Sequence, residues 1–335
     1  MIGLRRGLVK GARIAALGVY VPERVLTNDE LSRTLDTSDE WIASRTGIRE
    51  RRIARADQAS SDLAVEAARR ALAVGGLAAH DIDLVIVATI TPDMFFPATA
   101  SIVADKIGAT RAGAFDLEAG CTGFIYGLAA ATAFVSAGIY HNILVIGAEV
   151  LSRSLDWEDR RTCVLFGDGA GAVVVTASDN GGIFSFDLGN DGSGAEHLSL
   201  PAGGSRLPAT HETIDRHEHF MHMLGSEVYK FATRVIVESC EKVLADAEVT
   251  VADVDLFVPH QANIRIIEAA AKRLGFKSDQ VFHNLDHYGN TSCASIPLCL
   301  AEAVAGGRLK KGDTLLMAGF GAGLTWGSCL TEWDL

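Results

Sequence analysis

The stretch DLVIVATIT, residues 83–91, is an apolar, β-branched run introduced by an aspartate, and DLFVPHQAN, residues 255–263, opens in the same way. Short continuous runs of this kind are typical of strands buried on both faces of a mostly parallel sheet. Segments with helical spacing follow each run, as in chains that alternate strands and helices. The pair therefore indicates an α/β fold that uses one plan twice.

The spacing beyond the two runs repeats as well. Cys121 lies 37 residues after Leu84 (121 − 84), and Ser292 lies 36 residues after Leu256 (292 − 256). Both positions fall in a glycine- or threonine-containing turn before a helical pattern. A glycine-rich turn that opens a helix is therefore expected at the same place in each half.

A third pair of runs keeps this register. NILVIGAEV (142–150) and DTLLMAGFGA (313–322) each place a strand 58 or 59 residues after the leucine of the first run. We expect two pseudo-symmetric halves, residues 1–180 and 181–335, whose sheets pack through shared helices. The predicted architecture is a layered α/β/α/β/α structure.

Composition narrows the function. The chain has 335 residues, 48% of them hydrophobic, and a net charge of −12, which argues against a nucleic-acid partner. Its six cysteines lack C-x-x-C spacing, so neither a disulfide framework nor a metal site is expected. Arg13 interrupts the apolar N-terminal stretch, and no run reaches a membrane-spanning length, so we expect a cytoplasmic protein.

The stretch DLEAGCTGFIYGL (116–128) places Cys121 between Gly120 and Gly123, where a strand-like run gives way to helical spacing. A cysteine at a helix N-terminus is stabilised as the thiolate, and glycines allow a substrate to approach closely. We expect an ionised nucleophile here. A small buried hydrophobic residue is the alternative.

Two more polar residues follow predicted strands of the second half. His260 ends the apolar run in VPHQAN, and Asn290 lies in HYGNTSCASIP at the half-repeat position that corresponds to Cys121. Ligands of α/β folds bind at such strand ends, and pseudo-symmetry would bring the three residues together. Taken singly, the histidine and the asparagine also fit structural roles.

The glycine-rich segment FGAGLTWGSCL (320–330) offers backbone N–H groups near the predicted site. The amides of Cys121 and Ala322 could form an oxyanion hole for a thioester carbonyl. A tight hairpin turn is the alternative.

The segment DTSDEWIASRTGI (36–48) predicts a helix with a capping box from Thr37 to Glu40. Trp41 and Arg45 lie four residues apart on one face, and an aromatic plane beside a guanidinium suits an adenine ring and its phosphates. Helix packing is the alternative use of this face.

Two other motifs point to different functions. FGDGAGAVVV (166–175) fits a dinucleotide-binding pattern, but a β-branched strand follows it instead of a helix, which argues against a nicotinamide oxidoreductase. The order Cys121, His260, Asn290 resembles a papain-like cysteine protease. The sequence signature of those proteases is absent, so a cysteine hydrolase is kept as a distant alternative.

With these residues in view, the chain resembles the β-ketoacyl-[acyl-carrier-protein] synthase III family of the thiolase fold. The matching motifs are DTSDEWIASRTGIRERRI, AGCTGF, FGDGAGA, VPHQANIRII, YGNTSCASIP and FGAGLTWGS. The resemblance implies that Cys121 is acylated by an acyl-CoA. His260 and Asn290 would then stabilise the enolate formed when malonyl-acyl-carrier protein loses CO₂. It implies no metal or redox cofactor, and the initiation of fatty acid synthesis as the function.

The resemblance also assigns binding residues. It places the adenine of coenzyme A between Trp41 and Arg160. Its other coenzyme A positions are Thr37, Arg45, Gly225, Tyr229 and Asn263. Its carrier-protein contacts are Gln261 and Arg265, and nearby cations could extend a basic patch, namely Lys230, Arg234, Lys272 and Arg273. Solvated helix faces are the alternative for these charges.

The family forms homodimers in which a phenylalanine reaches the acyl pocket of the partner subunit, and Phe96 matches that position. Glu118 and the histidine-rich segment 204–223 depart from the family pattern, which leaves the starter acyl group open. A related enzyme of secondary metabolism, which condenses an unusual starter or only transfers an acyl group, is the nearest alternative. A non-catalytic scaffold would have no reason to keep all three site residues.

Overall fold

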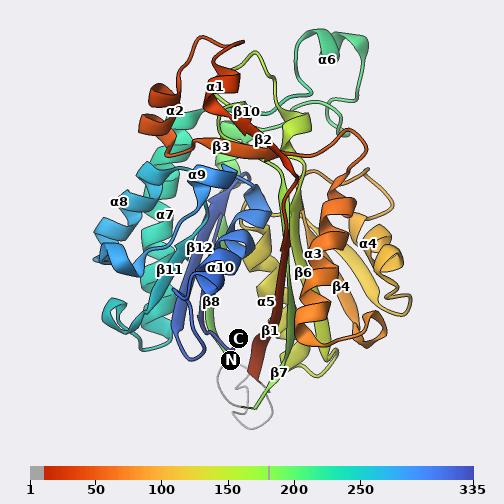
Figure 1. Ribbon diagram of the computed structural model, residues 1–335, viewed down its shortest axis with the longest axis vertical. Coiled ribbons are helices and arrows are strands. Elements are labelled where there is room, and N and C mark those ends of the chain that lie inside the picture. The colour runs from red at the N-terminus through yellow and green to blue at the C-terminus, as the bar shows by residue number, and fades with distance from the viewer. Residues whose placement is uncertain (1–10, 180–181) are drawn as a thin grey trace.

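A computed structural model describes residues 11–179 and 182–335, and its main strands form two sheets (Figure 1). The first sheet has the order β1-β7-β6-β4-β5 and contains β1 (Gly11–Tyr20), β4 (Leu84–Ala88), β5 (Gly113–Leu117), β6 (Asn142–Glu149) and β7 (Gly169–Ser178). The second has the order β11-β12-β13-β8 and contains β8 (Ile183–Asn190), β11 (Leu256–Pro259), β12 (Thr314–Gly321) and β13 (Thr325–Glu332). In each sheet one strand, β7 or β13, runs against the others. Residues 1–10 and the expected boundary at 180–181 lie outside the described residues.

The internal repeat is visible in the strand register. Leu84 of β4 pairs in parallel with Ile143 of β6, and Leu256 of β11 pairs in parallel with Leu315 of β12. The two offsets are therefore both 59 residues (143 − 84 and 315 − 256). An isolated parallel bridge between Phe257 and Val281 lies beside β11, where β5 lies beside β4 in the first half.

Two helices fill the space between the sheets, α5 (Gly123–Ser136) and α10 (Ser295–Ala305). Phe124 and Leu128 of α5 and Leu300 of α10 are buried in one cluster with residues from both sheets. A shared helical layer of this kind joins the halves into one hydrophobic core.

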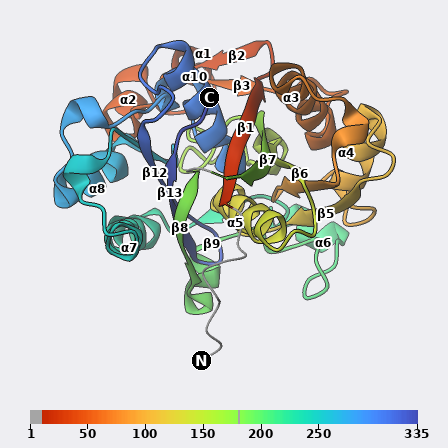
Figure 2. The same ribbon diagram turned by 90° about the horizontal axis from the view of Figure 1, so that it is seen from below.

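Helices also cover the outer face of each sheet. The first sheet is covered by α3 (Ser60–Gly75) and α4 (Thr99–Ile107), and the second by α7 (Gly225–Asp246) and α8 (Ile264–Leu274) (Figure 2). Along β4, Leu84 and Ile86 face the central layer while Val85 and Val87 face the outer helices. Because a strand presents alternate residues to opposite faces, a wholly apolar run is needed here. The predicted five-layer α/β/α/β/α architecture is confirmed.

Smaller elements form the upper end of the molecule in Figure 1. They are β2 (Arg24–Thr27), α1 (Asn28–Leu31), α2 (Asp39–Thr46), β3 (Glu50–Ile53), β9 (Leu198–Ser199), α6 (His211–Asp215), β10 (His222–Met223) and α9 (Leu285–Tyr288). The α2–β3 connection packs on the second half, since the Arg49 N–H donates to the Asp286 carbonyl at 3.0 Å. Among the described residues, no helix is both long and apolar enough to cross a bilayer.

The FGDGAGA motif has a structural use in this fold. Its last residues begin β7, so the expected strand replaces the helix of a dinucleotide site. The buried Asp168 carboxylate accepts hydrogen bonds from the Ala54 N–H at 2.7 Å and the Ser152 hydroxyl at 2.6 Å. The motif thus ties the β3 and β6 ends together.

Candidate active site

Cys121 lies between the end of β5 and the start of α5, as the sequence predicted. The preceding Gly120 has a φ of 53°, in the left-handed region that favours glycine. A Cβ atom at this position would lie 2.6 Å from the backbone nitrogen of Ala322. The cysteine turn of the first half therefore packs directly against the β12–β13 turn of the second.

The thiol of Cys121 is buried, with 4% of the residue exposed. Burial raises its pKa to about 12; a hydrogen bond from Ser292 opposes this rise and the charge of Glu149 adds to it. The prediction of an ionised cysteine is wrong for the free enzyme. Desolvation in the closed interface between the halves outweighs the stabilisation that a helix N-terminus gives a thiolate.

His260 directly follows β11, and its N–H donates to the Ala318 carbonyl at 2.7 Å. The Nδ1 atom lies 2.6 Å from the Ser295 hydroxyl, whereas Nε2 is buried without a hydrogen-bond partner among the described residues. Burial lowers the pKa of His260 to about 3. The imidazole is therefore neutral at physiological pH, and its free nitrogen is available to a ligand.

Asn290 is held by its backbone on both sides. Its N–H donates to the Leu165 carbonyl at 2.8 Å, and its carbonyl accepts from the Gly167 N–H at 3.0 Å. Its side-chain Oδ1 accepts from the Ser292 N–H at 2.9 Å. The Nδ2 donor is consequently the part of the carboxamide that remains for a ligand.

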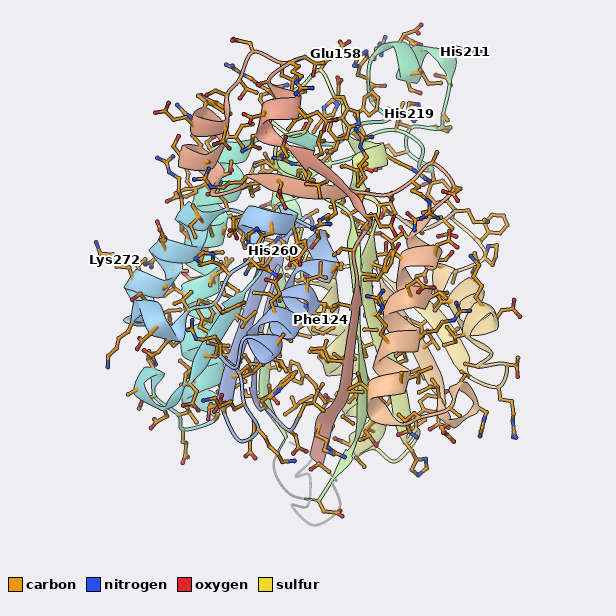
Figure 3. All side chains as sticks on the ribbon, in the orientation of Figure 1. Phe124, Glu158, His211, His219, His260 and Lys272 are labelled. Carbon is orange, nitrogen blue, oxygen red and sulfur yellow. The ribbon has the colours of Figure 1, made fainter. Side chains whose placement is uncertain are left out.

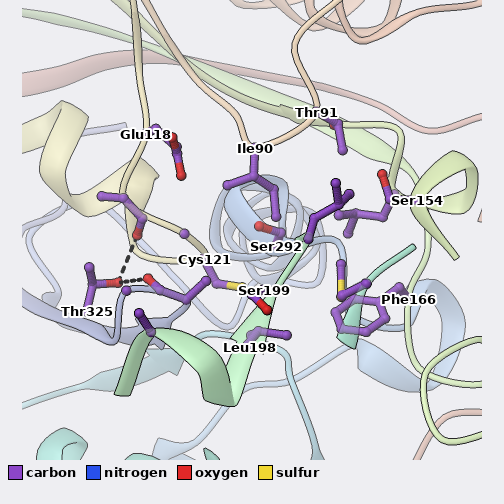
Figure 4. Close-up of a pocket in the computed structure, with 18 residues that line it drawn as sticks. Ile90, Thr91, Glu118, Cys121, Ser154, Phe166, Leu198, Ser199, Ser292 and Thr325 are labelled. Carbon is purple, nitrogen blue, oxygen red and sulfur yellow. Dashed lines mark hydrogen bonds between the residues drawn. The ribbon is translucent and has the colours of Figure 1, made fainter. Parts of the chain in front are cut away.

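Cys121 lines two cavities, of about 380 and about 130 Å³, at their junction. The larger is apolar and is shown in Figure 4; its lining includes Ile90, Leu151, Ser154, Phe166, Leu198, Leu200 and Met221. The smaller also contains His260 and Asn290. The structure therefore brings the three predicted site residues around one space. Figure 3 labels His260 among them.

The two backbone amides predicted as an oxyanion hole belong to adjacent segments. Cys121 and Ala322 both line the larger cavity. The Thr325 hydroxyl lies 2.9 Å from the Ala119 carbonyl and 3.0 Å from the Ala322 carbonyl, and so ties the two segments together (Figure 4). The segment 322–324 between β12 and β13 is a hairpin turn, the alternative use of these glycines, and the oxyanion hole stays a prediction.

Trp41 lies on α2, and two arginine guanidinium groups contact its indole ring. The Cζ atoms of Arg45 and Arg160 are 4.9 and 5.2 Å from its ring centroid. Arg160 also donates to the Asp36 carbonyl. An adenine ring that stacked between Trp41 and Arg160 would have to displace the arginine from the ring.

The helix cap near this tryptophan differs from the prediction. Ser38, not Thr37, is the N-cap of α2, and its hydroxyl accepts from the Trp41 N–H at 3.1 Å. The N-cap therefore lies one residue later than predicted, and the predicted capping box is wrong because Trp41, not Glu40, is the third helical residue. The Thr37 Oγ1 is buried without a partner among the described residues, which leaves it available to a ligand.

Three further residues that are predicted to bind coenzyme A line the smaller cavity, namely Gly225, Tyr229 and Asn263. The Asn263 Nδ2 donates to the Arg45 carbonyl at 3.1 Å, so one hydrogen bond connects this cavity to the α2 segment. Its Oδ1 accepts from the Arg265 N–H and caps α8. Asn263 therefore links the cavity at Cys121 to the segment that contains the predicted nucleotide residue Arg45.

The cations predicted to contact the carrier protein are all exposed on α7 and α8. They are Lys230, Arg234, Arg265, Lys272 and Arg273. Figure 3 shows Lys272 at the outer edge of α8. Gln261 differs, because it is only 1% exposed. Its Nε2 donates to the Pro259 carbonyl and its Oε1 accepts from the Asn284 N–H, so it holds its loop and offers no docking surface.

Phe96 is 84% exposed and lines neither cavity of its own chain at Cys121. The adjacent Phe95 is also exposed, so the β4–α4 loop presents two aromatic rings to the outside. Large exposed apolar side chains in one loop indicate a contact surface.

Glu118 and the histidine-rich segment 204–223, which depart from the family pattern, lie in different places relative to the site. Glu118 is exposed and lines the larger cavity. The labelled His211 and His219 lie near α6, well above His260 in Figure 3, and neither lines a cavity at Cys121. The segment around them contributes Met221 instead.

Ser295 and Glu149 were not predicted as site residues, and Ser292 entered only as a position of the internal repeat. Ser292 lies beside the nucleophile, Ser295 contacts the histidine, and Glu149 lies beside Ser292. The two serines lie inside the YGNTSCASIP motif, so their motif was noted but their roles were not. Glu149 carried one usable signal, a lone acid at the end of the buried run NILVIGAEV.

Comparison with known proteins gives a consistent result. Two family models match the chain: "3-Oxoacyl-[acyl-carrier-protein (ACP)] synthase III" at residues 115–192 and "3-Oxoacyl-[acyl-carrier-protein (ACP)] synthase III C terminal" at residues 244–333. The beta-ketoacyl-[acyl-carrier-protein] synthase III of Caldanaerobacter subterraneus subsp. tengcongensis is 55% identical over 96% of this chain and 98% of the relative.

Solved structures agree. The 3-oxoacyl-[acyl-carrier-protein] synthase III of Aquifex aeolicus VF5 superposes with a TM-score of 0.89 at 46% identity, covering 96% of this chain and 100% of that one. A priming beta-ketosynthase of a polyketide biosynthetic pathway has a TM-score of 0.91 at 37% identity, covering 99% of each chain.

Proposed function

This chain belongs to the 3-oxoacyl-[acyl-carrier-protein] synthase III family, and from that premise we propose that Cys121, His260 and Asn290 carry out its reaction. The enzyme condenses an acyl-CoA starter with malonyl-acyl-carrier protein and initiates fatty acid synthesis. The observation that carries the assignment of these residues is that Cys121 lies where an apolar cavity meets a cavity lined by His260 and Asn290.

The first half-reaction acylates Cys121. The adenine of acyl-CoA binds at Trp41 and Arg160, with Thr37 and Arg45 beside it, and pantetheine passes Gly225, Tyr229 and Asn263. The Cys121 sulfur attacks the thioester carbonyl, and the C–S bond to coenzyme A breaks. The N–H groups of Cys121 and Ala322 stabilise the oxyanion, which is where preorganised donors contribute most.

The second half-reaction uses the neutral histidine. If the Ser295 hydroxyl donates to Nδ1 of His260, then Nε2 carries the proton and donates into the cavity. Nε2–H and the Asn290 Nδ2 stabilise the enolate as malonyl-acyl-carrier protein loses CO₂. The enolate carbon attacks acyl-Cys121, and the products are 3-oxoacyl-carrier protein and CO₂. Loss of CO₂ supplies the driving force, so the reaction needs no metal or redox cofactor.

The larger cavity receives the acyl group. Its lining is mainly apolar and its volume of about 380 Å³ exceeds what an acetyl group occupies. Burial of each further methylene is favourable by about 0.8 kcal/mol. We infer a starter longer than acetyl.

The carrier protein docks on the cations of α7 and α8. An acidic enzyme, with a net charge of −12, needs such a local patch to attract an acidic partner. The enzyme acts as a cytoplasmic homodimer, in which the exposed Phe96 closes the acyl cavity of the partner subunit.

The same chemistry could serve a secondary-metabolite pathway. The similarity to a priming ketosynthase of polyketide synthesis supports this second assignment, although its identity of 37% is lower than the 55% of the fatty acid relative. The two assignments differ in starter and acceptor, and share the site.

Mass spectrometry of the enzyme with a panel of acyl-CoAs, then with malonyl-acyl-carrier protein, tests the function. An acyl adduct on Cys121 that is discharged as a 3-oxoacyl product supports it. An adduct that only hydrolyses would favour the cysteine hydrolase instead. Cys121→Ser should abolish the adduct.

A further inference from the structure

A buried carboxylate that the mechanism above does not use lies beside the nucleophile. Glu149 ends β6 and is fully buried. Its carboxylate accepts hydrogen bonds from the Thr91 hydroxyl at 2.6 Å, the Thr89 hydroxyl at 3.1 Å and the Ile90 N–H at 3.2 Å. A buried acid is costly unless it is hydrogen-bonded, and here burial still raises its pKa. Such a group can accept a proton.

Ser292 connects this carboxylate to the nucleophile. Its side chain lines the same cavity as Cys121, and its hydroxyl lies close enough to the Cys121 thiol and to the Glu149 carboxylate to lower the pKa of each. The same hydroxyl oxygen lies 3.9 Å from the Cys293 sulfur. Figure 4 shows the Ser292 side chain next to Cys121. Its φ of 48° lies in the left-handed region, which is uncommon for a residue with a side chain and occurs where surrounding contacts require it. That backbone conformation accompanies the Ser292 N–H contact to Asn290.

We propose that Ser292 and Glu149 form a proton relay that takes the thiol proton of Cys121 during acylation and returns it after condensation. The relay rests on the function proposed above. The Cys121 S–H proton moves to the Ser292 oxygen as the Ser292 O–H proton moves to Glu149. The thiolate attacks the acyl-CoA, and the coenzyme A thiolate that leaves takes a proton from water.

The second half-reaction closes the cycle. Attack of the enolate on acyl-Cys121 releases the cysteine as a thiolate. Glu149 then returns its proton through Ser292, which restores the thiol and the carboxylate. One proton is consumed overall, as decarboxylative condensation requires. While the acyl-enzyme waits, Glu149 is neutral and does not repel the negative malonyl group.

Few titratable groups face the relay. They are Cys121 from the turn before α5, Cys293 from the 3₁₀ turn Ser292–Ala294, and Glu149 from β6; His260 faces Cys121 from the end of β11. His260 is already neutral, and Cys293 donates to the Gly120 carbonyl at 3.0 Å. Glu118 also lines the cavity at Cys121, three residues before the cysteine, but it is exposed to solvent. Glu149 is therefore the one buried carboxylate among these groups.

The test is single-turnover acylation of the full-length enzyme by butyryl-CoA from pH 6 to 9.5, followed by quenched mass spectrometry. With Glu149→Gln we expect a loss of about 10²-fold at pH 7, the usual contribution of a positioned base. The remaining rate should rise about tenfold per pH unit, because hydroxide must then remove the proton of a thiol whose pKa is about 12. The wild-type rate should level off once Glu149 is ionised.

A purely electrostatic role makes the opposite prediction. The Glu149 charge raises the pKa of the Cys121 thiol, so its removal alone would lower that pKa and speed acylation. A purely structural role would lower the rate equally at every pH. Either outcome overturns the relay.

Ser292→Ala provides a second variant if Glu149→Gln does not fold. It keeps the backbone N–H that holds Asn290 and should give the same steep pH profile. Cys240→Ala, which changes a buried cysteine of α7 in the core of the second half, is the matched control and should keep the wild-type profile. If wild-type enzyme forms no acyl adduct at all, the proposed function fails; if it does and both variants keep its profile, only the relay fails.

Discussion

The Oδ1 atom of Asn290 accepts a hydrogen bond of 2.9 Å from the backbone N–H of Ser292. Only the oxygen of a carboxamide can accept, so this contact fixes which end of the side chain points away from the backbone. The NH₂ group is left toward the cavity that also contains His260. A backbone contact in its own loop thus orients Asn290 for the donor role that we propose.

Asn290→Asp should separate the two half-reactions. The aspartate can still accept from the Ser292 N–H, but it turns a negative oxygen toward the developing enolate. We expect condensation to fall by at least about 10²-fold, as for loss of an oxyanion donor, while acylation changes little. Acyl-enzyme is measured by mass spectrometry and 3-oxoacyl product by its release. Equal losses in both steps would contradict this division, and Asn290→Ala should show the same split.

His260 should not titrate in the working range. Burial lowers its pKa to about 3, so the imidazole stays neutral well below its ordinary pKa of 6.5. Discharge of preformed acyl-enzyme should therefore show no inflection near pH 6.5 that is due to His260. The same shift in pKa makes the free energy of unfolding depend on pH. Between pH 6.5 and about 3 the unfolded state binds a proton at His260 that the folded state does not, so stability falls as pH decreases. An inflection near pH 6.5 that disappears in His260→Gln would refute a neutral donor.

The fold was predictable because its signals are local. Continuous apolar runs and the glycines around Cys121 gave the strands, their repeat and the turn before α5. The histidine at a strand end was predictable for the same reason. The one-residue error in the α2 cap arose because Thr37 and Ser38 have equivalent side chains, and only the backbone angles of Ser38 distinguish them.

Properties that depend on the other half of the molecule were not predictable. The Cys121 thiol is neutral because Gly321 and Ala322 close over its turn, some two hundred positions later in the chain. Gln261 faces inward because Asn284 binds its side chain. Local sequence specifies neither contact, so composition and spacing gave the wrong charge state and the wrong exposure.

Arg160 and Trp41 should affect coenzyme A binding specifically. Loss of one face of a stacked adenine typically costs about 1–2 kcal/mol, so Trp41→Ala and Arg160→Ala should each raise KM for acyl-CoA about 5- to 30-fold. The KM for malonyl-acyl-carrier protein should not change. Arg161→Ala is the matched control, because that exposed arginine pairs with Asp159 instead. Initial rates over both substrate concentrations decide the matter, and an equal effect of Arg161→Ala would contradict the assignment.

Charge reversal should identify the carrier-protein surface. Arg265 and Lys272 are exposed, and neither forms an ion pair with another residue in the described part of the chain. The double variant Arg265→Glu/Lys272→Glu should raise KM for malonyl-acyl-carrier protein about tenfold at low salt, with the difference shrinking as salt screens the charges.

Two controls accompany this variant. Arg308→Glu/Lys310→Glu makes the same charge change on two exposed residues after α10 and should leave that KM unchanged. Gln261→Ala should instead lower the free energy of unfolding by about 1–3 kcal/mol, because it leaves the buried Asn284 N–H unsatisfied. A salt-independent effect of the double variant would exclude electrostatic docking at this face.

The apolar cavity predicts the starter group. If each methylene added to the acyl chain is buried against Ile90, Leu151 and Phe166, kcat/KM for acylation should rise about fourfold per carbon from acetyl-CoA to about six carbons. The rise should stop where the chain meets Ser154, which lines this cavity together with the next one toward Phe95. Quenched-flow mass spectrometry with straight acyl-CoAs of two to ten carbons measures the series.

Ser154→Phe tests the position of that limit. A phenyl ring there would fill the far end of the cavity, so the ratio of hexanoyl to acetyl transfer should fall by at least about tenfold, the equivalent of losing two buried methylenes. We expect this change in the transfer ratio to reflect contact with the far end of the acyl chain, because Ser154 and Cys121 lie on opposite parts of the cavity lining in Figure 4. A wild-type enzyme that prefers acetyl-CoA to every longer substrate would show that the acyl chain does not enter this cavity. The apolar side chains of its lining would then only pack the two halves together.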